Sequence, residues 1–297
     1  MQPRSYDYAV LALGVCAVST AVLLIREADA PSIVIAAYRL TLASLPLLAV
    51  SFVRGGSPVR GRRERVLLTV LAGVLLALHF ATWIASVKQT SIATSVFLVT
   101  TSPLFVALAS GPILGEKPQA AMWWGIVIAG GGGAVMVADD LGAGGQTLLG
   151  DLYALLGALF ASGYYLIGRR LRSDGEAWLP YVTLAYSTSA IVLIAMTLTS
   201  GHALFDYSGR TYVYLGLLAV IPQLVGHTAL NRSLGYLPAV VVSMAVRGEP
   251  VGATILGLIF LNETPTSLEV LGAILIMAGV YVALRTPTQR PAVNPAS

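Results

Sequence analysis

Two side chains of opposite charge, Arg247 and Glu249, lie within a long apolar stretch at residues 243–265. About 20 apolar residues cross a bilayer core, and an arginine at the centre of such a span costs about 2.5–3.5 kcal/mol on insertion scales. We therefore expect both groups to face protein or water, and Glu249 is the leading candidate for a functional residue. Positions two apart on a helix point about 200° away from each other. One side chain should thus face an internal site and the other a neighbouring helix, and the sequence leaves open which.

Arg39 is the third charged residue that falls deep within an apolar run. A guanidinium buried there could hold the carboxylate of a substrate, or pair with Glu249 when no substrate is bound. Two structural alternatives stay open, a permanent ion pair and a snorkelling side chain whose charged head reaches the membrane surface. We favour a role at the internal site.

Three polar residues, Gln223, His227 and Asn231, follow one another at intervals of four within a single apolar run. This spacing places them on one stripe of an α-helix, which we expect to face the internal site. His79 and Trp83 form a similar pair in an earlier run and supply a titratable ring and a broad aromatic surface. Each histidine could instead be a core imidazole that bonds to a neighbouring backbone or hydroxyl group.

An aromatic substrate needs an aromatic wall, and several rings lie in the apolar runs: Trp83, Phe97, Tyr164, Tyr165 and Tyr186. We take Trp83 and Tyr164 as candidate substrate contacts, together with Thr100 in the run that also holds Thr101 and Ser102. The alternatives are ordinary helix packing for the rings and, for the threonine, a hydrogen bond to its own helix backbone.

Glu249 precedes Pro250, and an earlier apolar run contains Pro103. A proline removes a backbone hydrogen bond and bends a helix, and the freed carbonyl is tolerated at mid-membrane where it lines a cavity. We interpret Glu249, Pro103 and Pro250 as candidate coupling and hinge positions, with a static bend as the alternative. Proton exchange through Glu249 or a histidine is a hypothesis that rests on burial alone.

Hydrophobic residues make up 56% and charged residues 11% of the 297-residue sequence, and the mean hydropathy is +0.79. Soluble domains carry about 25% charge, so we expect an integral membrane protein. The net charge of +4 does not indicate nucleic acid as a partner, because the basic residues stand in short clusters between apolar runs. The single cysteine excludes an internal disulfide and disfavours a multi-cysteine metal site. We expect neither a metal nor another cofactor.

Apolar runs bounded by charges, prolines or polar turns predict an all-α protein with ten transmembrane helices. The predicted spans are 7–25, 32–53, 66–87, 91–112, 119–138, 150–168, 178–199, 211–231, 238–261 and 267–284. With the N-terminus inside, most of the 18 basic residues fall on the cytoplasmic side, and only Arg26, Lys88 and Arg210 fall outside. This bias follows the positive-inside rule, so both termini are expected in the cytoplasm.

The sequence repeats itself at a constant shift of 147 residues, which pairs Pro103 with Pro250 and Gly125 with Gly272. The repeat divides the chain into halves at 1–143 and 144–297, each with five spans. Because five is odd, the second half must insert upside down. Inverted repeats of this kind are a common transporter architecture, with the substrate site near the midplane between the halves.

The motifs LGEKP at 114–118 and LNETP at 261–265 each follow a proline-bearing helix and precede a glycine-bearing one. This pattern, which covers essentially the whole chain, resembles the drug/metabolite transporter superfamily with its paired EamA domains. Size and general pattern are similar to the bacterial aromatic amino acid exporters of that superfamily. The resemblance implies ten helices around a central cavity, a bacterial inner-membrane location and export from the cytoplasm.

We therefore predict a secondary transporter, not an enzyme, that exports aromatic or other neutral amino acids by alternating access and acts as a monomer in the lipid bilayer. The alternatives are an exporter of drugs or other metabolites, an intramembrane enzyme, and a channel or scaffold. An intramembrane aspartyl protease is disfavoured, because no aspartate falls in the middle of a predicted span.

Overall fold

The computed structural model describes residues 5–54, 63–90, 92–138, 148–261 and 266–285, and its regular elements are helices. The first half of the chain comprises α1 (Ser5–Val18), α2 (Ala21–Glu27), α3 (Ser32–Val53), α4 (Arg63–Gln89), α5 (Ile92–Val99), α6 (Ser102–Leu114) and α7 (Ala120–Ala138). The second half comprises α8 (Leu148–Ser173), α9 (Trp178–Thr199), α10 (Gly209–Leu218), the π-helical segment η2 (Ala219–His227), α11 (Thr228–Ser233), α12 (Ala239–Val246), α13 (Glu249–Leu261) and α14 (Ser267–Leu284).

These helices form the ten membrane segments that the hydropathy pattern predicts. Within the described residues, eight continuous or broken helical segments are long and apolar enough to span a bilayer, and two shorter apolar helices, in α7 and α14, complete the set of ten. The predicted all-helical fold is confirmed. The predicted boundary between residues 143 and 144 lies outside the described residues and stays a prediction.

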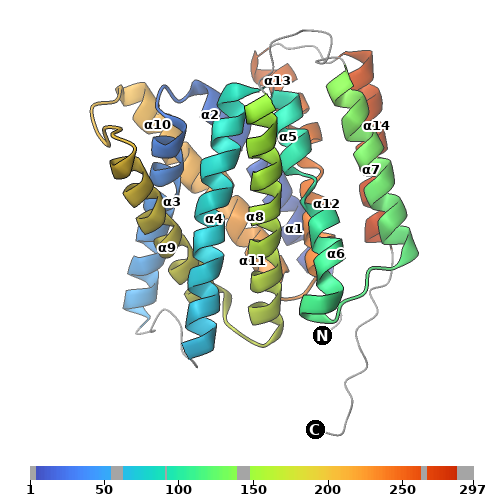
Figure 1. Ribbon diagram of the computed structural model, residues 1–297, viewed down its shortest axis with the longest axis horizontal. Helices are drawn as coiled ribbons and strands as arrows, with labels where there is room; N and C mark the ends of the chain where they lie inside the picture. Colours follow the sequence, from blue (N-terminus) through green and yellow to red (C-terminus); the bar gives the residue numbers. More distant parts are fainter. Residues whose placement is uncertain (1–4, 55–62, 91, 139–147, 262–265, 286–297) are drawn as a thin grey trace, which may run out of the picture.

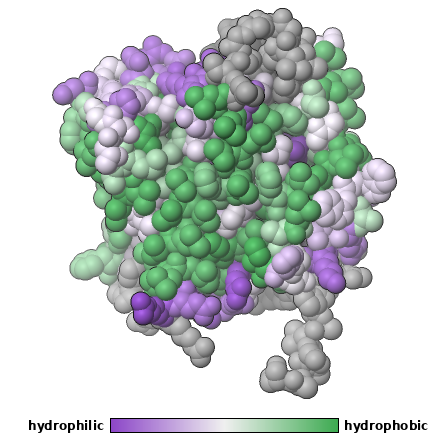
Figure 2. Space-filling view, viewed as in Figure 1, coloured by the Kyte–Doolittle hydropathy of each residue, from purple (hydrophilic) through white to green (hydrophobic). Residues whose placement is uncertain are grey.

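The surface matches a protein that sits in a bilayer. Figure 2 shows an apolar band around the middle of the visible face, with hydrophilic residues above and below it. Helix α1 begins and helix α14 ends on the same side of the helical bundle, the lower face of Figure 1. The connection between α9 and α10 lies on the opposite side, here called the upper face.

Several spans are broken near the middle rather than bent at a proline. The span at 92–114 breaks between α5 and α6 at Thr100 and Thr101, and the span at 239–261 breaks between α12 and α13 at Arg247 and Gly248. Pro103 and Pro250 each occupy the second position of the helix that follows the break. Proline is well tolerated in a first helical turn, where its missing N–H has no intrahelical partner to lose. The prolines therefore begin a new helix, and the expected kink lies two to three residues ahead of each.

Glycines let α7 and α14 pack with their backbones in close contact. A Cβ atom on Gly125 would lie 2.7 Å from the carbonyl oxygen of Gly279, and one on Gly132 would lie 2.7 Å from that of Gly272. The shift of 147 residues pairs Gly125 with Gly272 and Gly132 with Gly279, so repeat-related glycines face each other crosswise. Small residues serve helix packing in membranes in this way.

A left-handed glycine ends α6. Gly115 has φ 68° and donates backbone hydrogen bonds to Gly111 and Ser110, which is a common helix ending that glycine permits without strain. The turn that the second motif predicts, including Asn262 and Glu263, lies outside the described residues.

Replacement of Gly132 by alanine should destabilise the protein. Its new methyl group would meet backbone atoms of α14 at 2.7 and 2.8 Å, and such overpacking costs about 1–3 kcal/mol. Thermal unfolding of the purified protein in detergent would measure the change. Gly131→Ala is the matched control, because nothing lies within 4 Å of the Cβ it would add. Equal unfolding temperatures for the two variants would contradict the packing argument.

Candidate functional site

A small cavity of about 30 Å³ lies inside the bundle, between the two halves of the chain. Its walls come from both halves, and the polar and aromatic lining residues are Arg39, His79, Trp83, Thr100, Ser102, Tyr165, His227 and Glu249. A water molecule needs roughly 10–15 Å³ of such space, so the cavity has room for one or two waters. It must widen before a metabolite can enter.

Arg39 is the most deeply buried charge at this cavity, with 0% of its surface exposed. Its Nε donates a 2.8 Å hydrogen bond to Oε1 of Gln223 on η2, and its guanidinium carbon lies 4.1 Å from the ring centroid of Phe80 on α4. Nη1 and Nη2 have no hydrogen-bond partner. The side chain is thus held at its base and along one face, while its outer donors are left for a ligand. The alternative of a snorkelling arginine does not fit this placement.

The two predicted histidines meet across the halves. His79 on α4 and His227 at the end of η2 have ring centroids 6.4 Å apart, and both line the cavity. Nδ1 of His79 donates a 2.9 Å hydrogen bond to the carbonyl oxygen of Gly157 on α8, which fixes the tautomer of that ring. His79 stacks on Trp83 with an interplanar angle of 7°. The rings of His79, Trp83, His227 and Tyr165 form the aromatic wall of the cavity, and Phe80 packs behind the two histidines at centroid distances of 4.8 and 5.1 Å.

Of the three residues in the predicted stripe on the eighth span, one lines the cavity and two hold neighbouring side chains in place. Only His227 of the three lines this cavity, whereas Gln223 holds Arg39 and Asn231 donates hydrogen bonds to the hydroxyl of Tyr164 at 2.5 Å and to the carbonyl oxygen of His227 at 2.7 Å. The predicted stripe requires regular α-helical turns, but η2 is a π-helix that contains Pro222. π-helical turns are wider and often occur at functional sites. The altered turn changes where each side chain points.

The structure places Tyr165, rather than Tyr164, at the cavity. Tyr164 lies one position away on α8, is 1% exposed, and stacks on Tyr181 at 6.4 Å. It therefore supports Asn231 from behind the wall. Thr100 lines the cavity, and its hydroxyl donates to the carbonyl oxygen of Val96 at 2.7 Å. Thr100 therefore lines the cavity and also bonds to its own helix backbone, the two roles that the sequence left open.

The choice between Arg247 and Glu249 is clear in the structure. Glu249 lines the cavity, and its Oε1 has no hydrogen-bond partner. Arg247 lies with its guanidinium carbon 5.9 Å from the ring of Phe97 and is not a lining residue. Three ion pairs join described residues, and none of them involves Arg39 or Glu249. Arg39 and Glu249 therefore do not form an ion pair in this conformation, which argues against a permanent bridge between them.

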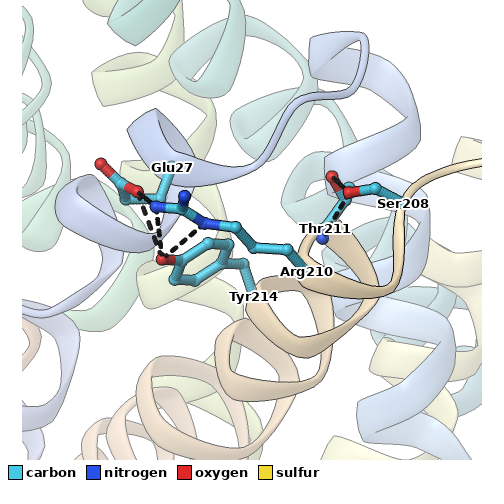
Figure 3. A network of polar contacts seen from close by, with 5 residues as sticks. All are labelled: Glu27, Ser208, Arg210, Thr211 and Tyr214. Atoms are coloured by element: carbon cyan, nitrogen blue, oxygen red, sulfur yellow. Dashed lines mark hydrogen bonds and ion pairs between the residues drawn. The ribbon is translucent and has the colours of Figure 1, made fainter.

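Ion pairs at the two ends of the bundle connect the halves, which the sequence did not reveal. On the lower face, Arg169 of α8 contacts Glu116 at 2.6 Å and donates to the carbonyl oxygen of Leu234 at 3.0 Å. The side chains of Arg169 and Glu116 are 6% and 17% exposed. On the upper face, Arg210 of α10 contacts Glu27 of α2 at 2.5 Å, and Tyr214 donates to the same carboxylate (Figure 3). Arg210 and Glu27 are 73% and 39% exposed.

Sequence comparisons place the chain among membrane transporters. The EamA-like transporter family matches twice, over residues 5–138 and 148–285. The pseudopaline exporter CntI of Pseudomonas aeruginosa is 24% identical over 265 residues, which cover 89% of this chain and 90% of the exporter. An uncharacterized transporter of Archaeoglobus fulgidus is 26% identical over 252 residues, which cover 84% of this chain and 86% of that protein.

A solved structure shares the fold. A crystal structure with 18% sequence identity superposes with a TM-score of 0.78 and covers 95% of this chain and 98% of the other. At this identity the likeness concerns architecture alone. The two family matches between them span most of the described helices of both halves, including those that line the cavity. The chain belongs to the EamA-like transporter family and is therefore a multi-pass membrane transporter, not an enzyme.

Proposed function

We propose that this protein exports small metabolites from the cytoplasm by alternating access, with neutral amino acids, aromatic ones above all, as substrates. The observation that carries the proposal is the cavity itself, where a buried arginine and a buried glutamate lie beside an aromatic wall. Charged groups inside a membrane mark substrate or ion pathways. The similarity to an exporter of pseudopaline supports export, and it keeps other metabolites and drugs as the alternative substrates.

The proposed binding set consists of the residues at the cavity and those that hold them in place: Arg39, His79, Trp83, Thr100, Tyr164, Gln223, His227, Asn231 and Glu249. Rings of Trp83 and Tyr165, which line the cavity, would contact an apolar side chain, and the charged groups would contact the polar end of a substrate. The helix breaks ahead of Pro103 and Pro250 would act as hinges, since a broken helix can move one half against the other.

We further propose that the ion pairs at the two faces close the pathway in turn. Each pair joins one half of the chain to the other, so neither can persist while the halves separate at that face. The lower pair is nearly buried and the upper pair is largely exposed. Exposed pairs contribute little because water and salt screen them. The present conformation would therefore be held mainly at its lower face.

Transport in proteoliposomes tests the substrate class. Labelled phenylalanine and tryptophan should show saturable flux and counterflow, whereas lysine and a cationic drug should not, because the aromatic wall favours apolar side chains and Arg39 repels added positive charge. Threonine measures how far small neutral amino acids are accepted. Empty liposomes control for leakage. Flux of the drug alone would favour the alternative, an exporter of drugs. Flux of no compound would contradict the proposal.

Removal of the lower closure should open that face. In a Cys16→Ser background, Leu234→Cys reports on the contact of Arg169, because Leu234 is 0% exposed in the closed form. Glu116→Gln leaves a buried arginine unpaired, which costs about 3–5 kcal/mol, so labelling of the introduced thiol by a membrane-impermeant maleimide should rise about tenfold or more. Glu27→Gln at the upper face is the control and should leave the labelling rate unchanged or lower. Equal rates in all three backgrounds would contradict the closure.

The proposed location is the inner membrane of a bacterial cell, with a monomer whose termini both lie in the cytoplasm. The positive-inside bias supports this orientation, as do the start of α1 and the end of α14 on one face (Figure 1). A fluorescent protein fused after Ser297 should fold and fluoresce, and alkaline phosphatase fused at the same point should be inactive. An active phosphatase fusion would place that end outside and reverse the orientation.

A further inference from the structure

Two spans of this protein are broken at equivalent positions of the repeat. Thr100 and Thr101 separate α5 from α6, and a shift of 147 residues brings them onto Arg247 and Gly248, which separate α12 from α13. After the breaks, α6 begins at Ser102 and α13 begins at Glu249. In Figure 1, α6 runs toward the lower face and α13 lies toward the upper face, so the two half-helices run in opposite directions from mid-depth. Both of their first residues line the cavity.

The N-terminus of a helix carries a partial positive charge, because its first N–H groups have no intrahelical partner. In the interior of a membrane protein, half-helix N-termini commonly point at anionic groups. Here two such ends open onto one small cavity. The residue at the first helical position distinguishes one end from the other.

The two half-helices differ in charge at that position. The first turn of α13 carries its own carboxyl group, Glu249, whereas the first turn of α6 has no acidic residue and begins with the neutral hydroxyl of Ser102. The positive end of α13 is therefore matched within its own helix. In the first turn of α6, Pro103 has no N–H and the N–H of Leu104 donates to the carbonyl oxygen of Thr101 at 3.0 Å, so the N–H of Ser102 is the donor left to meet an anion there. No acidic side chain of that turn matches it, and the inverted repeat makes the contrast a direct one between equivalent sites.

Arg39 supplies the second, independent sign of an anion subsite. Its side chain is fully buried, lines the same cavity as Ser102, and leaves Nη1 and Nη2 without a partner. Gln223 and Phe80 fix its orientation. A buried guanidinium with two free donors is suited to bidentate binding of a carboxylate.

We infer that Arg39 and the N-terminus of α6 form a carboxylate subsite, and that Glu249 at the N-terminus of α13 faces the ammonium group of the same ligand. The inference rests on the proposed function and narrows its substrate class to zwitterions, with the aromatic wall left for the side chain. Ligands that lack the carboxylate bind poorly because two positive groups then stay unmatched in a water-poor cavity.

Binding of three related compounds to the purified protein tests this subsite: phenylalanine, 3-phenylpropanoate, which lacks the amino group, and phenethylamine, which lacks the carboxylate. Ligand-induced increases in unfolding temperature give their apparent affinities. Phenylalanine should bind best in the wild type, and phenethylamine about tenfold to hundredfold more weakly, as expected for loss of a hydrogen-bonded charged contact. In Arg39→Gln this preference for the carboxylate should disappear.

Ser102→Asp is the sharper variant, because it gives α6 the acidic first residue that α13 already has. An acidic residue suits a helix N-terminus, so the fold should be retained, while phenylalanine and 3-phenylpropanoate should lose affinity about tenfold or more. Ser102→Ala and Arg247→Gln are the matched controls. The former keeps the position neutral, and the latter removes the buried arginine that lies against Phe97. Both should retain the preference for the carboxylate.

Flux in proteoliposomes, measured in parallel, separates the two proposals. Carboxylate-dependent binding without flux of any amino acid would leave the subsite standing and overturn the transport function. The subsite would be overturned if phenethylamine were bound or transported as well as phenylalanine. It would also be overturned if binding and flux of phenylalanine were unchanged in both Arg39→Gln and Ser102→Asp. Failure of all three compounds to stabilise the wild type would do the same.

Discussion

The structure depends on the cost of placing charge inside a lipid bilayer. Arg39 and Glu249 lie in spans that are otherwise apolar, and neither group could face hydrocarbon at a tolerable energy. Both are instead enclosed between the two halves of the chain, with less than a tenth of their surface exposed. The halves must stay together for these groups to be shielded, yet a transporter's halves must also separate. At its two ends the interface is bridged by the ion pairs Arg169–Glu116 and Arg210–Glu27, which we propose to close it in turn.

The inverted repeat explains the packing and the helix breaks, but it does not explain the residues at the cavity. Crosswise glycine contacts between α7 and α14 and equivalent breaks in two spans follow from one ancestral pattern used twice. The symmetry is lost at the cavity itself, where Ser102 and Glu249 occupy equivalent positions of the repeat. A fully symmetric cavity would offer two identical ends to its ligand. The unequal pair lets the cavity distinguish one end of an asymmetric molecule from the other.

The two closures differ in the same way. The side chains of Arg169 and Glu116 are 6% and 17% exposed, so water and salt screen their attraction weakly. Arg210 and Glu27 lie at the exposed upper edge, where Tyr214 adds hydrogen bonds to a pair that water largely screens. Such unequal ends bias a two-state protein toward one conformation without preventing the other.

Hydropathy and the repeat were sufficient to predict ten helices, because each long apolar run must be a helix whatever its neighbours are. The family was predicted from the resemblance of the motifs at 114–118 and 261–265. The burial of Arg39 and Glu249 also followed from the sequence, since their cost in lipid does not depend on detailed geometry. The tertiary structure alone decided which side chains face the cavity. The π-helical turns of η2 change helical phase locally, so Gln223 and Asn231 hold neighbouring side chains instead of lining the cavity. On α8, packing between the helices places Tyr165 rather than Tyr164 at the cavity. The partners of Glu116 and Glu27 were likewise hidden, because an ion pair between distant segments is specified by packing and leaves no mark in local spacing.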